Sequence, residues 1–264
     1  MKTKQMSETQ PKEEFLESLA NGLKVLNIFG AGAYTLTIQE TAEHLDVTRA
    51  AARRLVLTLE KLGYLQQIGR QFSLTPKVLD LGYAYFSSLG LHDLMRPIMQ
   101  EIAAEIGETC SLGVLDGQHI VFVAREETGR LLKLDLNVGS RLPAYAHSMG
   151  QVLLAGLDKD GLDRYFQQAT LKPLTPYTYT SKTALKDLLK KVREQGYSIS
   201  VSELVEGFAG VSIPVATASG EVLAGLGVSM VLGSRGQAYL EERVLPVLLA
   251  AAPRIRAAIP DRGR

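Results

Sequence analysis

The chain has 264 residues, of which 46% are hydrophobic and 22% are charged, and its formal net charge is +1. This length allows two domains with a sizeable buried core, and the near-neutral charge gives no global sign of a nucleic-acid partner. The single cysteine, Cys110, excludes an internal disulfide framework and a multi-cysteine metal site, which suits a reducing cytoplasm. The sequence shows neither a secretory signal pattern nor an apolar run of the ~18 residues that a bilayer requires, so we expect a cytoplasmic protein without a membrane partner.

The first part of the chain predicts a group of short helices. Residues 1–14 are polar and without periodicity, and we expect them to form a disordered tail. Apolar residues at helical spacing predict one helix in residues 15–30, which the sequence GAGA ends, and a second helix in residues 35–45. The apolar residues at helical spacing in the first helix are Leu19, Leu23, Leu26 and Phe29, and the residues of the second helix expected to face inward are Ile38, Ala42 and Leu45.

A third helix follows after a short turn at Asp46 and Val47. Thr48 is placed to cap this helix, which runs to about Leu62 and is closed by Gly63. Three helices within so short a stretch predict a compact unit.

A change of period predicts a β-wing after the third helix. Residues 64–75 are bounded by strand-forming residues, with Gly69 and Arg70 at the expected hairpin tip. A linker helix then follows, with Thr75 as its cap and Pro76 at its first helical position, and it reaches to about residue 89. The apolar residues of this linker, which are spaced for burial of one helix against another, are Val78, Leu81, Tyr85 and Leu89.

From His92 onward the pattern predicts an α+β domain with a predominantly antiparallel sheet flanked by helices. Helices are expected in residues 93–107, 148–157, 159–168, 181–195 and 237–258, and strands in residues 110–117, 119–126, 130–139, 197–204, 209–217 and 221–232. Tight turns are expected at Asp116-Gly117, Thr128-Gly129 and Ser219-Gly220, and a loop in residues 171–180.

The third helix sorts its side chains into an apolar face and a basic face. On a helical wheel Ala51, Leu55, Leu59 and Leu62 share the inner side, whereas Arg49, Ala50, Arg53 and Glu60 face away and Arg54 lies laterally. Residues 48–70 hold five basic residues and one acidic residue, a local balance of +4. Such local concentration of charge is typical of a surface that contacts phosphates.

A helix-turn-helix presents the start of its second helix to base edges in the major groove. Arg49 and Arg53 are positioned for bases, Thr48 and Arg54 for phosphate, and small Ala50 for close approach of the backbone. Arg70 at the wing tip is positioned for the DNA backbone or the minor groove. The sequence therefore predicts that the chain binds double-stranded operator DNA.

The alternative is a solvated basic face on a winged-helix module that binds proteins and never touches DNA. Four features disfavour it: Ala42 in the second helix, the tight turn at Asp46 and Val47, the small residues 50–52, and a wing directly afterwards.

Several stretches together resemble the IclR family of bacterial transcriptional regulators. They are SLANGLKVLNIF, the helix-turn-helix, LEKLGYL with its wing, and AYAHSMGQVLLAGL, and the resemblance covers residues 15 to about 260. The segment GSRLPAYAHSMGQVLLA at residues 139–155 is the most specific part. The sequence of this segment looks most like that of the branch that controls catabolism of aromatic acids, including protocatechuate and 4-hydroxybenzoate, through the β-ketoadipate route.

The resemblance implies a domain order and an assembly. It implies a winged helix-turn-helix domain in residues 15–75, a linker helix in residues 76–91, and a GAF-like effector domain with an antiparallel sheet in residues 92–264. It also implies a homodimer through the DNA-binding domains, and often a homotetramer through the effector domains. Two reading helices would then meet a two-fold-related DNA site.

The resemblance also implies an effector pocket, carried over by position to Leu131, Leu134, Leu142, Ser148, Met149, Ser200, Phe208, Gly210, Gly227 and Ser229. A small carboxylate needs donors at one end and an apolar wall at the other, and the helix starting near Ser148 is expected to supply free backbone N–H groups. Ser200 and Ser229 add hydroxyls, and Phe208 with the leucines could sandwich a ring. Gly210 and Gly227 open space that suits an aromatic acid, unless neighbouring side chains fill it.

Two flanking residues have two interpretations each. Arg141 and His147 lie beside this helix start and are candidates to neutralise the charge of a carboxylate. Alternatively, Arg141 is a surface residue on a bend before Pro143, and His147 is a hydrogen-bonded structural group.

An enzyme is disfavoured because the required groups are missing from the sequence. His147-Ser148 and Cys110 invite a nucleophile hypothesis, but no GxSxG pattern, no cluster among the four histidines and no complete dinucleotide loop accompanies them. We expect Cys110 to be a small residue entering a strand, and we expect no metal and no cofactor beyond the carboxylate effector. Effector binding would change domain orientation through the linker helix, and with it operator affinity or contact with RNA polymerase.

Overall fold

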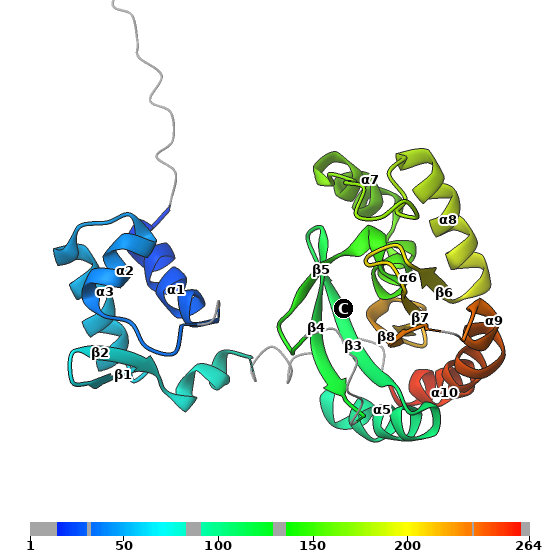
Figure 1. Ribbon diagram of the computed structural model, residues 1–264, viewed down its shortest axis with the longest axis horizontal. Coiled ribbons are helices and arrows are strands. Elements are labelled where there is room, and N and C mark those ends of the chain that lie inside the picture. The colour runs from blue at the N-terminus through cyan, green and yellow to red at the C-terminus, as the bar shows by residue number, and fades with distance from the viewer. Residues whose placement is uncertain (1–14, 31–32, 83–90, 129–135, 234, 260–264) are drawn as a thin grey trace, which may run out of the picture. The chain divides into compact units, whose positions relative to one another are not determined.

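The computed structural model describes residues 15–30, 33–82, 91–128, 136–233 and 235–259. The chain divides into two compact units, residues 1–85 and 86–264, and each is described by itself (Figure 1). The division falls within the segment that the sequence assigns to the linker.

The N-terminal unit is a three-helix group followed by a β-hairpin. Its elements are α1 (Glu17–Gly30), α2 (Ile38–Leu45), α3 (Arg49–Lys61), β1 (Leu65–Ile68) and β2 (Gln71–Leu74). The two strands pair antiparallel with Gly69 and Arg70 between them, which confirms the expected wing. Its buried core consists of Val25, Phe29, Leu36, Val56, Leu59, Leu65 and Phe72.

Local capping residues place the helix-turn-helix. The hydroxyl of Thr37 accepts a hydrogen bond from the backbone of Glu40, and the Glu40 carboxylate accepts one from the Thr37 backbone, which forms a capping box at the start of α2. Asp46 ends α2 in the left-handed region at φ 52°. Thr48 caps α3 by accepting a hydrogen bond from the backbone N–H of Ala51 at 3.2 Å, as the sequence predicts.

The inner side of α3 differs from the expected one. Ala52, Val56 and Leu59 are buried, whereas Leu55 is half-buried and Leu62 is 52% exposed. The two candidate stripes are adjacent on the helical wheel, and the contacts of α3 with α1, α2 and β1 decide between them. The expected stripe through Leu55 and Leu62 is therefore wrong by about one position.

The apolar residues of α1 are divided between the core and the surface. Val25 and Phe29 are buried, but Leu19 and Leu23 are 61% and 52% exposed. Both leucines, together with Ala51 and Leu55 of α3, line a groove of about 600 Å³ on the surface of the N-terminal unit.

The start of the linker segment is as expected, but its first turn is tighter. Thr75 accepts a hydrogen bond from the backbone of Lys77, and Pro76 occupies the first helical position of a 3₁₀ turn, η1 (Pro76–Val78). Val78 is half-buried and Leu81 is 48% exposed. The helix continues to residue 82, and Tyr85 and Leu89 lie outside the described residues.

The C-terminal unit is built on one six-stranded antiparallel sheet in the order β5-β4-β3-β8-β7-β6. The strands are β3 (Thr109–Asp116), β4 (His119–Glu126), β5 (Arg141–Pro143), β6 (Ser198–Val201), β7 (Phe208–Ala216) and β8 (Val222–Val231). Of the strand expected at residues 130–139, residues 130–135 lie outside the described residues and residues 136–139 are not in a strand. Thr128 is described but its expected turn partner Gly129 is not.

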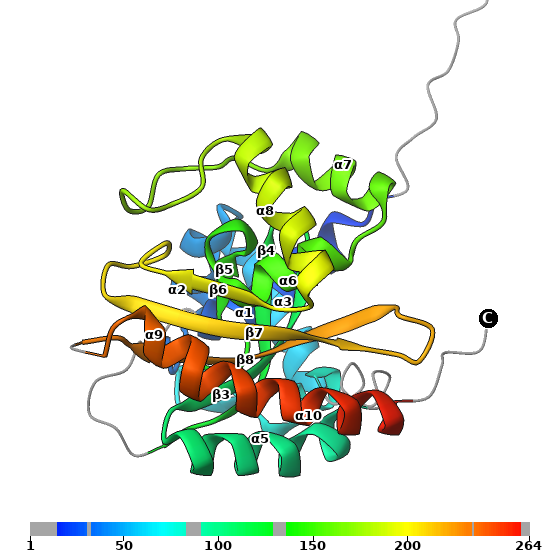
Figure 2. The same ribbon diagram turned by 90° about the vertical axis from the view of Figure 1, so that its right-hand side faces the viewer.

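Helices cover both faces of this sheet (Figure 2). On one face lie α5 (His92–Ile106) and α10 (Leu245–Ala258), and α10 follows α9 (Gln237–Tyr239) and a π-helical turn (Leu240–Val244). On the other face α6 (Ser148–Gly156) lies against β7 and β8, and α7 (Lys159–Gln168) and α8 (Lys182–Gln195) lie beyond it. This arrangement confirms the expected α+β class.

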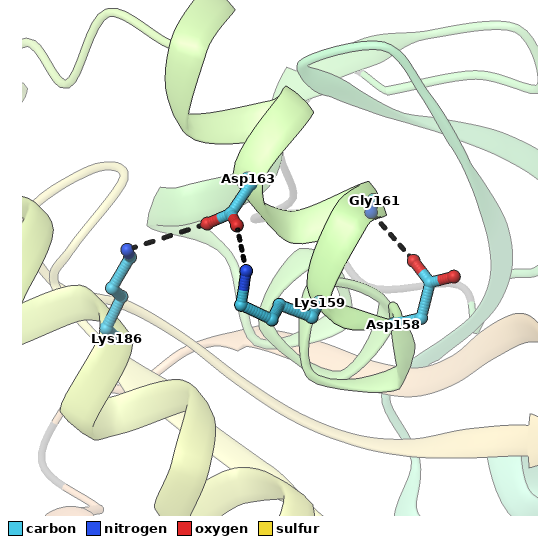
Figure 3. A network of polar contacts seen from close by, with 5 residues as sticks. All are labelled: Asp158, Lys159, Gly161, Asp163 and Lys186. Carbon is cyan, nitrogen blue, oxygen red and sulfur yellow. Dashed lines mark hydrogen bonds and ion pairs between the residues drawn. The ribbon is translucent and has the colours of Figure 1, made fainter.

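Polar contacts fix α7 at its start and join it to α8 (Figure 3). Asp158 caps α7 by accepting a hydrogen bond from the backbone of Gly161 at 2.7 Å. Asp163 forms ion pairs with Lys159 at 3.1 Å and with Lys186 of α8 at 3.9 Å. Such exposed pairs add little stability, so the buried apolar residues beneath α6 and α8 hold this layer.

Glycines allow α6 to approach its neighbours very closely. A Cβ atom on Gly150 would lie 2.1 Å from the carbonyl oxygen of Ala144, which belongs to the 3₁₀ turn η2 (Ala144–Ala146). Met149 lies over Gly113 of β3 and Gly225 of β8, where a Cβ atom would come within 2.5 and 2.6 Å of its side chain. The position of α6 therefore depends on the absence of side chains at these three sites.

We predict that Gly150→Ala destabilises the C-terminal unit by at least about 2 kcal/mol, because the added methyl group meets backbone atoms that cannot move aside. Urea unfolding followed by far-UV circular dichroism measures the change. Gly22→Ala is the control, because a Cβ atom there meets nothing within 4 Å and alanine is the better helix former. A Gly150→Ala variant as stable as the control would contradict the proposed close packing.

Candidate nucleic-acid interface and effector site

The start of α3 presents an exposed basic surface. Arg49, Ala50, Arg53 and Arg54 are all exposed, as is Thr48 at the cap. In the described part of the chain no ion pair engages these arginines. Their guanidinium groups are therefore not neutralised by carboxylates of the described part of the N-terminal unit.

The wing adds a further cation to this unit. Arg70 lies in the turn between β1 and β2 and is exposed. The Thr48 oxygen is already a hydrogen-bond acceptor in the cap, which leaves its O–H available as a donor. All six residues that the sequence assigns to DNA contact are thus exposed.

The start of α6 has its first donors occupied. The backbone N–H of Ser148 donates to the Ser200 hydroxyl at 3.1 Å, and that of Met149 donates to Nδ1 of His147 at 3.1 Å. The hydroxyls of Ser148 and Ser212 lie 2.9 Å apart. The expectation that both of these amides are free for a ligand is therefore wrong, because His147 and β6 satisfy them.

The sheet turns a face of small residues toward α6. We call it the α6 face, and its members are Ser111, Gly113, Gly210, Ser212, Gly225, Gly227 and Ser229. In register, Ser111 pairs with Gly227, which pairs with Ser212, and Ser229 pairs with Gly210. The three strands β3, β8 and β7 thus carry two adjacent polar rows beneath the start of α6.

The space that the two glycines were expected to open is filled by serines. A Cβ atom on Gly227 would lie 2.2 Å from the Ser212 hydroxyl, and one on Gly210 would lie 2.8 Å from the Ser148 hydroxyl. The glycines therefore admit serine side chains, and of the two alternatives the structure supports the one in which neighbouring side chains fill the space.

Arg125 is a buried cation that the sequence interpretation missed. Its side chain is 8% exposed and lies 5.2 Å over the ring of Phe122. One terminal nitrogen donates to the Ser111 hydroxyl at 3.1 Å, and the other lies 3.6 Å from the carboxylate of Glu127. Its Nε atom is buried without an acceptor among the described residues.

His147 is buried and uncharged at neutral pH. It is 2% exposed, and its ring meets Phe122 edge-on with centroids 6.0 Å apart. Burial, together with the charge of Arg125, lowers the pKa of His147 to about 4. Because Nδ1 accepts the Met149 hydrogen bond, the proton of the neutral ring is on Nε2, which has no acceptor in the described part of the chain.

The structure brings together most of the expected effector residues. Met149, Ser148 and Ser200 meet at the start of α6, Gly210, Gly227 and Ser229 lie on the α6 face, and Leu142 packs in the apolar cluster beneath the helix. Phe208 begins β7 two residues before Gly210 and so shares its face. Leu131 and Leu134 lie outside the described residues.

Arg141 does not belong to this group. It pairs in register with Val121, which packs on the side of α5 and α10, whereas Ile120 and Phe122 pack under α6. Its guanidinium lies 2.6 Å from the carboxylate of Asp116. Of its two interpretations, the structure supports the surface residue.

A signal for the missed residues is present in the sequence. Small residues recur at every second position in β3, β7 and β8, which marks a sheet face without bulky side chains, and this pattern includes Ser111 and Ser212. Arg125 and Phe122 give no comparable pattern, because β4 has an irregular register opposite Leu112 and Gly113.

Nucleophile and metal chemistry find no support among the described residues. Cys110 is buried in β3, and burial raises the pKa of its thiol, which makes it an inert core residue as expected. In residues 15–259, the described portions contain no group of three His, Cys, Asp or Glu side chains that could hold a metal. No described helix has the length and hydropathy to cross a membrane.

A winged helix-turn-helix with an exposed basic reading helix, on a chain that also carries a separate sheet unit, defines a DNA-binding transcriptional regulator. Residues 18–69 match the IclR helix-turn-helix domain, and residues 83–257 match the bacterial transcriptional regulator IclR C-terminal domain. The chain belongs to the IclR family.

Individual relatives agree with this membership. The chain is 41% identical over 240 residues to the Pca regulon regulatory protein of Pseudomonas putida, covering 90% of this chain and 82% of that protein. A crystal structure of a transcriptional regulator from Rhodococcus sp. RHA1 matches with a TM-score of 0.82 at 37% identity, over 92% of this chain and 98% of that one. A double mutant of the PobR inducer-binding domain from Acinetobacter, in complex with 3-hydroxybenzoic acid, matches with a TM-score of 0.59 at 31% identity, over 63% of this chain and 98% of that one.

We predict that His147 makes the C-terminal unit lose stability in acid. Since its pKa in the folded chain is about 4, below the ordinary value of 6.5, the unfolded chain binds this proton more tightly. The contribution of neutral His147 to the free energy of unfolding is fully present above pH 6.5. It decreases as the pH falls toward 4, by up to about 3 kcal/mol in total.

Urea unfolding of the wild type and of His147→Asn between pH 4 and 7 tests this. Asparagine can still cap α6 but does not titrate, and Glu203, whose buried carboxyl has a pKa raised to about 7, is common to both proteins. The difference in unfolding free energy between them should shrink as the pH falls. A difference that is independent of pH would contradict the assignment.

Proposed function

We propose that the chain binds double-stranded operator DNA through α3 and the wing, and that a small aromatic carboxylate bound to the C-terminal unit controls this binding. The DNA contacts we assign are Thr48, Arg49, Ala50, Arg53, Arg54 and Arg70. The DNA-binding part of the proposal rests on the exposure of the α3 arginines, which form no ion pair with any described residue. Phosphates and guanine edges provide the acceptors that such a surface lacks within the unit.

The effector half is supported by chemistry and by relatives. The α6 face offers hydroxyls beside the ring of Phe122, and Arg125 supplies a positive charge next to it. One matched relative is named for the Pca regulon, and one matched domain holds 3-hydroxybenzoic acid. We therefore place the effector at the start of α6, with Leu142, His147, Ser148, Met149, Ser200, Phe208, Gly210, Gly227 and Ser229 as its surroundings.

We further propose that the protein is a cytoplasmic homodimer or homotetramer. We propose that it binds no metal and no cofactor other than the effector, and that it is not an enzyme. Phe15, Leu16, Leu19 and Leu23 at the start of the N-terminal unit are each more than half exposed, and an apolar surface of this kind supports self-association. Effector binding would act through the linker on operator affinity or on contact with RNA polymerase.

We predict that Arg53→Ala weakens binding to the DNA upstream of the chain's own gene by about 1–3 kcal/mol, because a base contact is lost. Fluorescence anisotropy at fixed salt measures the change. Arg164→Ala is the control, since Arg164 is exposed on α7 in the other unit. Unchanged binding by Arg53→Ala would remove it from the reading face, and no wild-type binding at all would favour a protein-interaction module.

We predict that Phe208→Ala lowers the affinity for 4-hydroxybenzoate by about tenfold or more while DNA binding stays intact, because an aromatic contact surface is lost. Isothermal titration calorimetry and a gel shift provide the two readouts. Tyr177→Ala, which removes a ring that is 64% exposed, is the matched control. A Phe208→Ala variant that binds like the wild type would place the ligand elsewhere.

A further inference from the structure

Arg125 occupies an unusual position for an arginine. A guanidinium inside a sheet is costly unless its charge and its N–H groups are satisfied. Here the side chain is 8% exposed, and its polar partners among the described residues are one neutral hydroxyl, on Ser111, and the carboxylate of Glu127 at 3.6 Å. Its Nε–H finds no acceptor among the described residues, so the site is one acceptor short.

The register places this cation beside the proposed effector. Arg125 pairs with Ser111, Ser111 pairs with Gly227, and Gly227 pairs with Ser212, whose hydroxyl contacts Ser148 of α6. Of the two arginines in the described strands, Arg125 is therefore on the α6 face, whereas Arg141 is on the opposite face and is paired with Asp116.

A break in the regular pairing of β4 makes this possible. Leu112 pairs with Ala124 and Gly113 pairs with Phe122, so Val123 is an extra residue that forms a bulge. Without the bulge, strict alternation would turn Phe122 and Arg125 to opposite faces. With it, the guanidinium lies over the Phe122 ring on the α6 side of the sheet.

We infer that Arg125 binds the carboxylate of the effector and makes the site selective for aromatic acids over their amides. This inference rests on the proposed function. A planar guanidinium matches a carboxylate with directed hydrogen bonds, and a ligand oxygen would supply the acceptor that Nε lacks. Phe122, already in contact with the guanidinium, offers an apolar surface to the ring of the same ligand.

His147 completes the donor set without adding charge. Its ring also contacts Phe122, and its Nε2–H is a second buried donor that lacks an acceptor in the described part of the chain. Because His147 is neutral, the positive charge that the described residues supply at this end of the site comes from Arg125. Recognition of an acid, as opposed to a neutral acceptor, therefore depends on Arg125.

The test compares 4-hydroxybenzoate, protocatechuate and 4-hydroxybenzamide by isothermal titration calorimetry on the full-length chain. We expect the wild type to bind the acids more tightly than the amide. Arg125→Gln should lower the affinity for the acids by about 10- to 100-fold, as expected for loss of a charged hydrogen bond, and leave the affinity for the amide nearly unchanged. Arg141→Gln is the matched control, because it removes the other strand arginine from the opposite face.

Two results would overturn the inference: a wild type that binds the amide as tightly as the acids, or an Arg125→Gln variant that keeps the wild-type preference. Gel shift and thermal unfolding check that the variant folds. If it does not fold, Arg125→Met decides, because methionine removes the charge and the N–H donors but keeps an unbranched apolar side chain at this buried position. An unchanged ratio of acid to amide affinity in that variant would then count against Arg125. A wild type that binds none of the three ligands would instead contradict the proposed function itself.

Discussion

Helix α6 approaches the sheet more closely than a helix can over ordinary side chains. Gly113 and Gly225 leave room for Met149, Gly210 leaves room for the Ser148 hydroxyl, and Gly150 allows the helix to meet the backbone of Ala144. Serines then bridge the contact, because the hydroxyls of Ser148 and Ser212 lie 2.9 Å apart. Everything proposed for the effector depends on this packing, since it sets where the start of α6 lies over the sheet.

A buried polar network extends from the same helix. The amide of Gln151 donates to the carbonyl of Tyr145 and to the carboxylate of Glu203, and its oxygen accepts from Ser198 of β6. Burial raises the pKa of Glu203 to about 7, so Glu203 carries little charge in mildly acidic solution. Since buried networks are costly when one member is left unsatisfied, a shift of α6 would disturb β6 and the segment around Glu203 together. This couples the end of α6 where we place the effector to a wider part of the C-terminal unit.

Sequence periodicity predicted the elements better than it predicted their inner faces. Caps at Thr48 and Thr75 and the wing tip at Gly69 and Arg70 are local features, so spacing alone located them. The stripe of α3 that faces inward was wrong by about one position, because adjacent stripes are equally apolar and the packing partners choose between them. Net charge was uninformative for a similar reason, since DNA binding depends on where the arginines lie and the whole chain is nearly neutral.

The proposed effector site shows why strand register limits prediction from sequence. The small residues of β3, β7 and β8 follow a period of two, so their common face is readable from the sequence. Arg125 breaks this rule. Counted from Phe122 by strict alternation it belongs on the face toward α5 and α10, and only the bulge at Val123 moves it to the α6 face. A bulge is a property of two paired strands, so a single strand sequence does not reveal it. The residue best placed to recognise a carboxylate is therefore the one that a reading of β4 alone assigns to the wrong face.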